Sequence, residues 1–245
     1  PLYSSAASDV YKRQTLDSEG YDLLGLMTGS EGLLGVITEV IVKILKKPEA
    51  VKAALIGFSS IEDAGQCVSE IIAKGIIPAG MEIMDKALTK ATNDYSKAGY
   101  PIDAEAMMII ELDGTETEVS ELSKRVEDIA KKNKCSSIKI NKSEEERLKF
   151  WAGRKAAFPA CGDLAPDYMC MDGSIPRGKL AEVLKEIQRL SKKYELPVAN
   201  AFHAGDGNLH PLIMFNANDP EQLRKTEEFG SCLLYTSPSP RDVEE

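Results

Sequence analysis

The stretch ANAFHAGDGNLHP, residues Ala199–Pro211, contains both histidines of the 245-residue chain. Asp206–Gly207 near its centre is a strong two-residue turn signal, because glycine accepts the positive φ that a type I′ turn requires. The stretch is therefore predicted to form a β-hairpin. A turn centred on this pair places His203 directly opposite His210 on one face of the sheet, with Cβ atoms about 4.5–5.5 Å apart.

Two imidazoles at that separation can bind the same cation, and imidazole is the commonest metal ligand among side chains. His203 and His210 are therefore candidate ligands of a divalent metal ion. A catalytic centre usually needs a third protein ligand and an open position, and nothing else in the sequence identifies that third group. The alternative is a stacked pair of structural histidines.

Outward from the hairpin, the sequence alternates between strand and helix patterns. Apolar and β-branched runs predict strands at 51–58, 106–112, 135–140 and 167–175. Amphipathic runs predict helices at 60–75, 115–133, 143–158, 177–194 and 219–230. The less regular stretch 71–101 receives no firm assignment. This order predicts an α+β fold, a mostly antiparallel sheet with helices packed on one face.

A glycine-rich turn lies near the start of the chain, with Gly29, Gly32 and Gly35 at every third position. Glycines let a backbone approach a ligand closely, and successive N–H groups can form a concave anion site. The spacing matches neither the Walker loop nor the dinucleotide fingerprint. A tight turn that leads into the predicted strand 36–45, which ends before Pro48, is an equally good explanation.

Arg154 lies in the predicted helix 143–158, which a capping box from Ser143 to Glu146 opens. On a helix, Arg154 is close in angle to Trp151 and Phe158, at the rim of the apolar stripe. A partly desolvated guanidinium there favours pairing with a carboxylate, which makes Arg154 a candidate ligand-binding residue. The alternative is an arginine that buries its stem and reaches to water.

The composition excludes several classes of protein. Apolar content of 43% and charged content of 28% are ordinary for a globular protein. A net charge of −9 argues against a nucleic-acid or anionic-membrane surface. No apolar run approaches the roughly 20 residues of a transmembrane segment. The five cysteines are scattered, without a Cys-x-x-Cys pair, which argues against a disulfide framework and favours a reducing cytoplasm.

Both ends of the chain look foreign to the rest. Residues 1–14 and 231–245 continue no periodicity from their neighbours and resemble translated adapter DNA, so they are set aside as one would a tag. Ordinary disordered termini are the alternative. The natural gene is therefore expected to extend beyond Thr15 and Gly230, which would make this sequence a fragment.

Three stretches together, GYDLLGLMTGSEGLLGVITEV (20–40), FWAGRKAAFPACGDLAPDYMCMDGSIP (150–176) and VANAFHAGDGNLHPLIMFNANDP (198–220), resemble the FAD-linked oxidases of D-2-hydroxy acids. The likeness is greatest to the bacterial glycolate oxidase branch, with the D-lactate dehydrogenase branch nearby. It implies that 15–48 is the end of an FAD-binding domain and that 49–230 is the family's C-terminal substrate or cap domain. The implied activity is oxidation of glycolate or D-lactate to the 2-oxo acid, with hydride transfer to FAD.

The resemblance also implies roles for individual residues. Backbone contacts to FAD are implied at Glu31, Gly32, Leu33, Leu34, Gly35, Val36 and Ile37, although Leu33 stands where the family usually has threonine. His203 and His210 are similar to ligands of a divalent metal (zinc, manganese or iron), and Arg154 to the arginine that holds the substrate carboxylate. Cys170 stands where some 2-hydroxyglutarate-specific relatives have lysine, which argues against a dicarboxylate substrate.

The family's third metal ligand and candidate base come from a downstream Glu-His-Gly segment that this chain lacks, so the catalytic residue is unknown and the chain alone is expected to be inactive. The resemblance implies an iron–sulfur partner subunit as electron acceptor, since this chain has no clustered cysteines. It implies a bacterial cytoplasmic protein that reaches a membrane only through partner subunits. Two other functions stay open: a metal-dependent hydrolase that uses the histidine pair, and a non-catalytic docking module.

Overall fold

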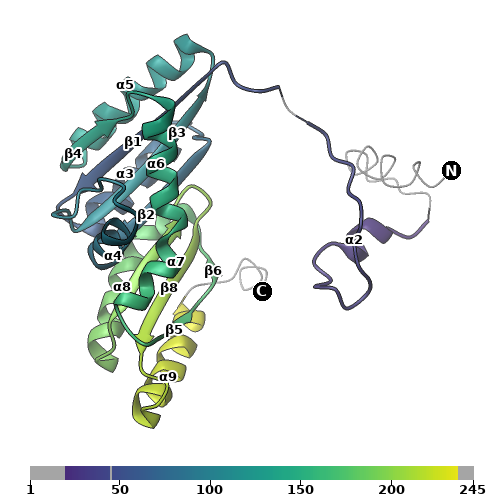
Figure 1. Cartoon of the computed structure of the whole chain (residues 1–245), viewed down its shortest axis with the longest axis vertical. Helices are drawn as coiled ribbons and strands as arrows, with labels where there is room; N and C mark the ends of the chain where they lie inside the picture. The colour runs from purple at the N-terminus through teal and green to yellow at the C-terminus, as the bar shows by residue number, and fades with distance from the viewer. Residues whose placement is uncertain (1–19, 45, 237–245) are drawn as a thin grey trace. The chain divides into compact units, whose positions relative to one another are not determined.

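The computed structural model describes residues 20–44 and 46–236. The chain divides into two compact units, Pro1–Lys47 and Pro48–Glu245, and each is described by itself (Figure 1). The predicted N-terminal tail, residues 1–14, lies outside the described residues. None of the described helices is long and apolar enough to cross a membrane.

The described part of the N-terminal unit contains one short helix, α2 (Leu23–Met27), whose first turn is capped by the Asp22 carboxylate. The glycine turn follows, with φ of 78° at Gly29 and 80° at Gly32. The strand predicted at 36–45 is wrong for its described part, because residues 36–44 form no strand. A strand needs a hydrogen-bonded neighbour, and the described residues of this unit provide none. Its β-branched side chains are consequently exposed.

The second unit is built on one antiparallel sheet (Figure 1). The order across the sheet is β4-β1-β3-β2-β7-β8-β5, with β6 also paired to β8, and every recorded pairing is antiparallel. The strands are β1 (Ala50–Phe58), β2 (Gly80–Asp85), β3 (Ala106–Gly114), β4 (Cys135–Ile140), β5 (Asp167–Cys170), β6 (Gly173–Ser174), β7 (Val198–His203) and β8 (Asn208–Phe215). The predicted α+β class is confirmed.

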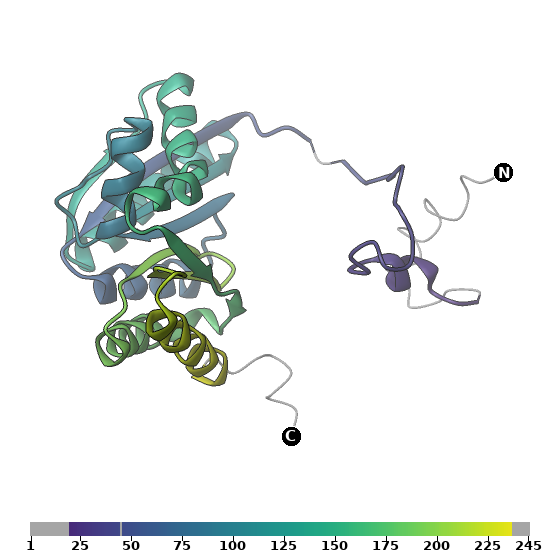
Figure 2. The ribbon, with the colours of Figure 1, turned by 60° about the horizontal axis from the view of Figure 1, so that its bottom comes forward.

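Four long helices pack on one face of this sheet, called here the first face: α3 (Ile61–Ala73), α5 (Glu116–Lys132), α8 (Leu180–Tyr194) and α9 (Pro220–Thr236). A smaller layer covers part of the opposite, second face: α4 (Lys86–Ser96), α6 (Glu144–Lys155) and α7 (Ala157–Ala160). Figure 2 shows helices on both sides of the sheet. Short 3₁₀ turns lie at Cys161–Asp163 and Arg177–Lys179.

The second layer exists because the central strands are apolar on both sides. In β3, Met108 and Ile110 belong to the core of the first face, whereas Met107 and Ile109 belong to the core of the second. A continuous apolar run, as in 106–110, rather than an alternating one, is typical of a strand that is covered on both faces.

The predicted capping box of α6 is half formed. Ser143 Oγ accepts from the Glu146 N–H, as predicted, but the Glu146 carboxylate accepts from the N–H of Lys142 rather than from that of Ser143. The backbone N–H groups that these side chains accept from are hydrogen-bonded, which still favours the start of the helix here.

The strand predicted at 167–175 is divided into β5 and β6. The division lies where Met171 meets Pro211 of β8: the Met171 N–H donates to the Pro211 carbonyl at 3.0 Å. The reverse bond cannot form because proline has no N–H, so the ladder is interrupted at this pair.

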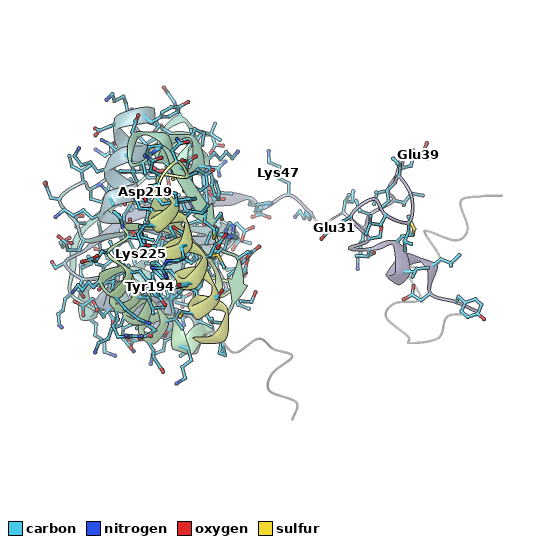
Figure 3. The ribbon with its side chains drawn as sticks, turned by 90° about the horizontal axis from the view of Figure 1, so that it is seen from below. Glu31, Glu39, Lys47, Tyr194, Asp219 and Lys225 are labelled. Carbon is cyan, nitrogen blue, oxygen red and sulfur yellow. The ribbon has the colours of Figure 1, made fainter. Side chains whose placement is uncertain are left out.

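The last helix is longer than predicted. It continues from Gly230 to Thr236, into the stretch expected to be a foreign tail, and Leu233 is buried in the core of the first face. Tyr194 at the end of α8 stacks on Phe229 of α9, with ring centroids 5.6 Å apart (Figure 3 labels Tyr194). Apolar contacts at helical spacing therefore extend this helix beyond its predicted end.

Candidate functional site

The histidine hairpin is present, but its predicted register is wrong. His203 pairs with Asn208, and His210 pairs with Ala201, so the histidines are diagonal neighbours rather than directly opposite. The loop between the strands has four residues, 204–207. The His203 carbonyl accepts from the N–H groups of both Asp206 and Gly207, and Gly205 donates to the Met81 carbonyl of β2. This bond to a neighbouring strand could not be seen in the local sequence.

The histidines nevertheless share one face, the second. The true partner of His203 is two residues away from the predicted one, and a shift of two keeps every side chain on its own side of the sheet. The ring centroids are 5.1 Å apart and the ring planes are nearly perpendicular, at 89°. The two rings are therefore neighbours on one face, as predicted, and their role as joint metal ligands stays a prediction.

Glu82 is a third residue of this cluster. It lies in β2, which pairs with β7 so that Ile83 faces Phe202. Its Oε1 is 2.7 Å from His203 Nδ1. The glutamate side chain is 10% exposed and that of His203 is 43% exposed. The carboxylate thus tethers the more exposed of the two imidazoles.

Sequence reasoning missed Glu82, because it lies in the stretch 71–101 that received no assignment. A signal was available in GMEIMD, residues 80–85. Met81 and Ile83 alternate with Glu82 and Met84, which is the pattern of a strand with two faces. A single acidic residue between buried apolar neighbours then indicates a charge that needs a partner.

Arg154 comes to the same carboxylate from the last turn of α6. Its Nε and Nη2 lie 3.0 Å and 2.9 Å from Glu82 Oε2. Its side chain is 9% exposed, so it is more buried than the predicted rim position. The predicted pairing of Arg154 with a carboxylate is present, but the carboxylate belongs to Glu82 of the protein rather than to a ligand.

A glycine allows α6 to come this close to its neighbours. A Cβ at Gly153 would collide with the Tyr100 hydroxyl and with Ala98. Tyr100 in turn donates a hydrogen bond of 2.5 Å to the Phe150 carbonyl of α6. Burial raises the pKa of Tyr100, so the phenol remains a neutral donor.

His210 has a weaker tether than His203. Its Nδ1 is 3.6 Å from the exposed Asp172 carboxylate, which is too far for a hydrogen bond. Burial lowers the pKa of His210; Asp172 opposes this effect, and the nearby His203 and Arg154 add to it. The neutral form, which is the form that binds metals, is therefore favoured at neutral pH.

Two further residues lie on the same face near this cluster. Asn208 is paired with His203, and its Oδ1 is buried without a hydrogen-bond partner among the described residues. Cys170 pairs with Leu212, two residues from His210. Burial raises the pKa of the Cys170 thiol, so it is not an activated nucleophile at neutral pH.

The predicted FAD contacts, Glu31 to Ile37, lie in the N-terminal unit, where Figure 3 labels Glu31. These residues are all exposed, and Glu31 has a positive φ of 51°. An exposed, left-handed turn is suited to backbone contacts with a ligand. The FAD assignment of these seven residues stays a prediction.

The two imidazoles of this cluster are suitable ligands for a divalent ion, although they do not form a complete site. A carboxylate on Nδ1 of a histidine, with Nε2 left for the metal, is the usual arrangement around metal-binding histidines. His203 and Glu82 have this arrangement. Among the described residues, however, no three or more His, Cys, Asp or Glu side chains gather as a complete metal site. The described residues thus include two candidate imidazole ligands and no identified third.

The chain belongs to the FAD linked oxidases, C-terminal domain family, whose model matches residues 47–233. Among curated proteins, it is 54% identical to glycolate oxidase subunit GlcD of Escherichia coli K12, over 89% of this chain and 44% of that protein. It is 37% identical to the Bacillus subtilis protein of the same name, over 86% and 45%. The mitochondrial D-lactate dehydrogenase [cytochrome] of Arabidopsis thaliana is 31% identical, over 92% and 40%.

The chain therefore spans less than half the length of these relatives. Two solved structures share the fold at low identity. An alkyldihydroxyacetonephosphate synthase matches with a TM-score of 0.64 at 18% identity, over 90% of this chain and 45% of that one. A p-cresol methylhydroxylase with bound substrate matches with a TM-score of 0.57 at 14% identity, over 78% and 44%.

Proposed function

We propose that this chain is the substrate- and metal-binding part of an FAD-dependent oxidoreductase that converts a small D-2-hydroxy acid, glycolate or D-lactate, to the 2-oxo acid. The observation that carries the proposal is the cluster of Arg154, Glu82, His203 and His210 on one face of the sheet. The names of the relatives support the substrate class, and the family supports FAD.

The same proposal divides the chain into 15–48, the end of an FAD-binding domain, and 49–230, the substrate domain. The sequence is then a fragment of a longer protein, which agrees with its covering less than half of each curated relative. The FAD contacts are proposed at residues 31–37, in the first of these parts. The proposed location is the bacterial cytoplasm.

Arg154 binds the substrate carboxylate in this proposal. Nε and Nη2 of Arg154 contact Glu82, so Nη1 is the guanidinium nitrogen that remains for the substrate. Holding the carboxylate in one place fixes the orientation of the reacting carbon, which lowers the entropic cost of the reaction.

Glu82 neutralises much of the charge of Arg154, so this pair alone attracts an anion only weakly. A second cation near His203 and His210 would restore the attraction. When bound there, a divalent ion supplies Lewis acidity that lowers the pKa of the substrate hydroxyl. The flavin, when bound, supplies the hydride acceptor.

A separate electron acceptor completes the proposal. The relatives from Escherichia coli and Bacillus subtilis are named as subunits, which agrees with a multi-protein oxidase. An iron–sulfur subunit is the proposed partner, since the five cysteines are scattered along the sequence rather than clustered. Family membership favours this oxidoreductase over a metal-dependent hydrolase or a docking module.

The test uses a longer chain that joins this sequence to its flavin-binding domain. Glycolate or D-lactate should bleach the flavin absorbance without oxygen, and Arg154→Ala should slow that bleaching at least 100-fold. Activity from a protein that holds no flavin would favour the hydrolase instead. Unchanged bleaching in Arg154→Ala and His203→Gln would contradict the assigned roles.

A further inference from the structure

Glu82 is the only described carboxylate that contacts both the arginine and a histidine of the candidate site. Its two oxygens are used separately: Oε2 accepts from Arg154, and Oε1 lies 2.7 Å from His203 Nδ1. These three side chains come from β2, α6 and β7, so they are distant along the chain. The contacts were not expected from the sequence.

Arg154 acts through Glu82 on which ring nitrogen of His203 carries the proton. Arg154 Nε donates to Oε2 of the Glu82 carboxylate at 3.0 Å, Nη2 lies 2.9 Å from the same oxygen, and a carboxylate oxygen acts only as an acceptor. An acceptor at 2.7 Å requires a proton on the facing ring nitrogen, Nδ1. The other nitrogen of a neutral His203, Nε2, then has a free lone pair.

Burial makes this arrangement stiff. Glu82 and Arg154 are 10% and 9% exposed, so water competes little for their bonds. His203 itself is 43% exposed, and an exposed imidazole without a tether would rotate and change tautomer freely. His210 is 15% exposed and is held mainly by its surroundings. The buried glutamate is therefore most important for His203.

We infer that Glu82 is a positioning residue, which fixes His203 as the Nδ1–H tautomer and links its orientation to Arg154. Glu82 thereby leaves Nε2 of His203 available to a divalent ion and Nη1 of Arg154 available to the substrate carboxylate. It also holds these two side chains together. This inference rests on the proposed function for its ligands. The tautomer itself can be measured without them.

The chain offers an unusually simple spectroscopic test, because it has two histidines. In the full chain labelled with ¹⁵N-histidine, long-range ¹⁵N–¹H spectra at pH 8 report the tautomer of each ring, and His210→Gln assigns the signals. His203 is expected as a single Nδ1–H tautomer. An Nε2–H tautomer, or a mixture of the two, would overturn the inference.

The second measurement is zinc binding by the same full chain. Glutamine has one carbonyl oxygen that accepts hydrogen bonds and one NH₂ group that only donates them. In Glu82→Gln one side-chain atom therefore cannot replace each of the two carboxylate oxygens that face Arg154 and His203. The zinc affinity should fall 10- to 100-fold, the usual effect of losing such an outer partner. An affinity equal to that of the wild type would overturn the positioning role.

Glu111→Gln is the matched control. Glu111 is a partly buried glutamate of this sheet, with a side chain 15% exposed, and it also accepts from an α6 arginine, Arg147, at 2.7 Å. Its other partner is Trp151 Nε1 rather than a histidine. This variant should leave both the His203 tautomer and the zinc affinity unchanged. An equal loss in both variants would show that Glu82 supports only the fold.

The outcomes separate this inference from the proposed function. If His203 has the Nδ1–H tautomer but flavin reduction by hydroxy acids is absent, the positioning role stands and the oxidoreductase assignment fails. If the longer flavoprotein is active while His203 has the other tautomer, the positioning role fails alone.

Discussion

His203 and His210 lie diagonally across the β7–β8 hairpin, with ring centroids 5.1 Å apart and ring planes at 89°. A perpendicular arrangement is favourable for two aromatic rings in its own right. The contact therefore agrees with a structural pair as well as with a pair of ligands. Phenylalanine can replace a histidine that only packs against another ring, but it cannot replace a metal ligand.

His203→Phe separates the roles. Phenylalanine keeps an aromatic ring against His210 but has no nitrogen, and the half-exposed position tolerates it. Because this change leaves the buried Glu82 Oε1 without its histidine donor, we expect the free energy of unfolding to fall by about 1–3 kcal/mol. Zinc binding, followed by calorimetry, should be lost. Retained zinc binding would show that the pair does not bind the ion.

The Arg154–Glu82 pair should show strong coupling. Arg154→Met leaves a buried carboxylate without its main partner, which costs about 3–5 kcal/mol in comparable pairs. The double variant Arg154→Met, Glu82→Leu should be much less destabilised than the sum of the single variants, because no buried charge is left alone. Urea unfolding of the four proteins gives the coupling directly. Additive effects would mean that the two side chains are independent.

Gly153→Ala should destabilise the protein although alanine is the better helix former. The new Cβ would collide with Tyr100 and Ala98, and overpacking of this kind costs about 1–3 kcal/mol. Gly162→Ala is the control, since its Cβ would meet nothing within 4 Å. Thermal unfolding of both variants checks the prediction. Equal melting temperatures would show that α6 is free to shift.

Asp85 should make stability depend on pH. Burial raises its pKa from 3.8 to about 6, against the opposing hydrogen bonds from Leu88 and Asn200. The folded state therefore binds a proton more tightly than the unfolded state does. The contribution of this carboxyl to stability is greatest below pH 3.8 and decreases as pH rises towards 6, by up to about 3 kcal/mol.

Asp85→Asn should remove that decrease. The variant amide can still cap α4, and rotation of the Asn200 amide would bring its Oδ1, which has no hydrogen-bond partner among the described residues, to the new N–H. Unfolding free energies measured from pH 4 to 7 should fall less steeply for this variant than for the wild type. Asp94→Asn, on the exposed side of the same helix, should keep the wild-type slope. Identical slopes in all three proteins would rule out Asp85 as the source.

Local patterns predicted most elements of the second unit, because their signals are contained within the elements themselves. The β1, β3 and β4 strands and the α3, α5 and α8 helices form close to their expected bounds. The apolar run at 36–44 has the same local signal and forms no strand, since pairing depends on a neighbour.

The hairpin, the common face of its two histidines and the antiparallel α+β class could be predicted from local patterns, since alternation and turn chemistry act over a few residues. The hairpin register, the burial of Arg154 and the position of Glu82 between arginine and histidine depend instead on long-range contacts. Glu82 lies 72 residues from Arg154 and 121 from His203 along the chain. Contacts across such separations depend on which strands become neighbours, and the pairing of β2 with β7 is a property of the whole sheet.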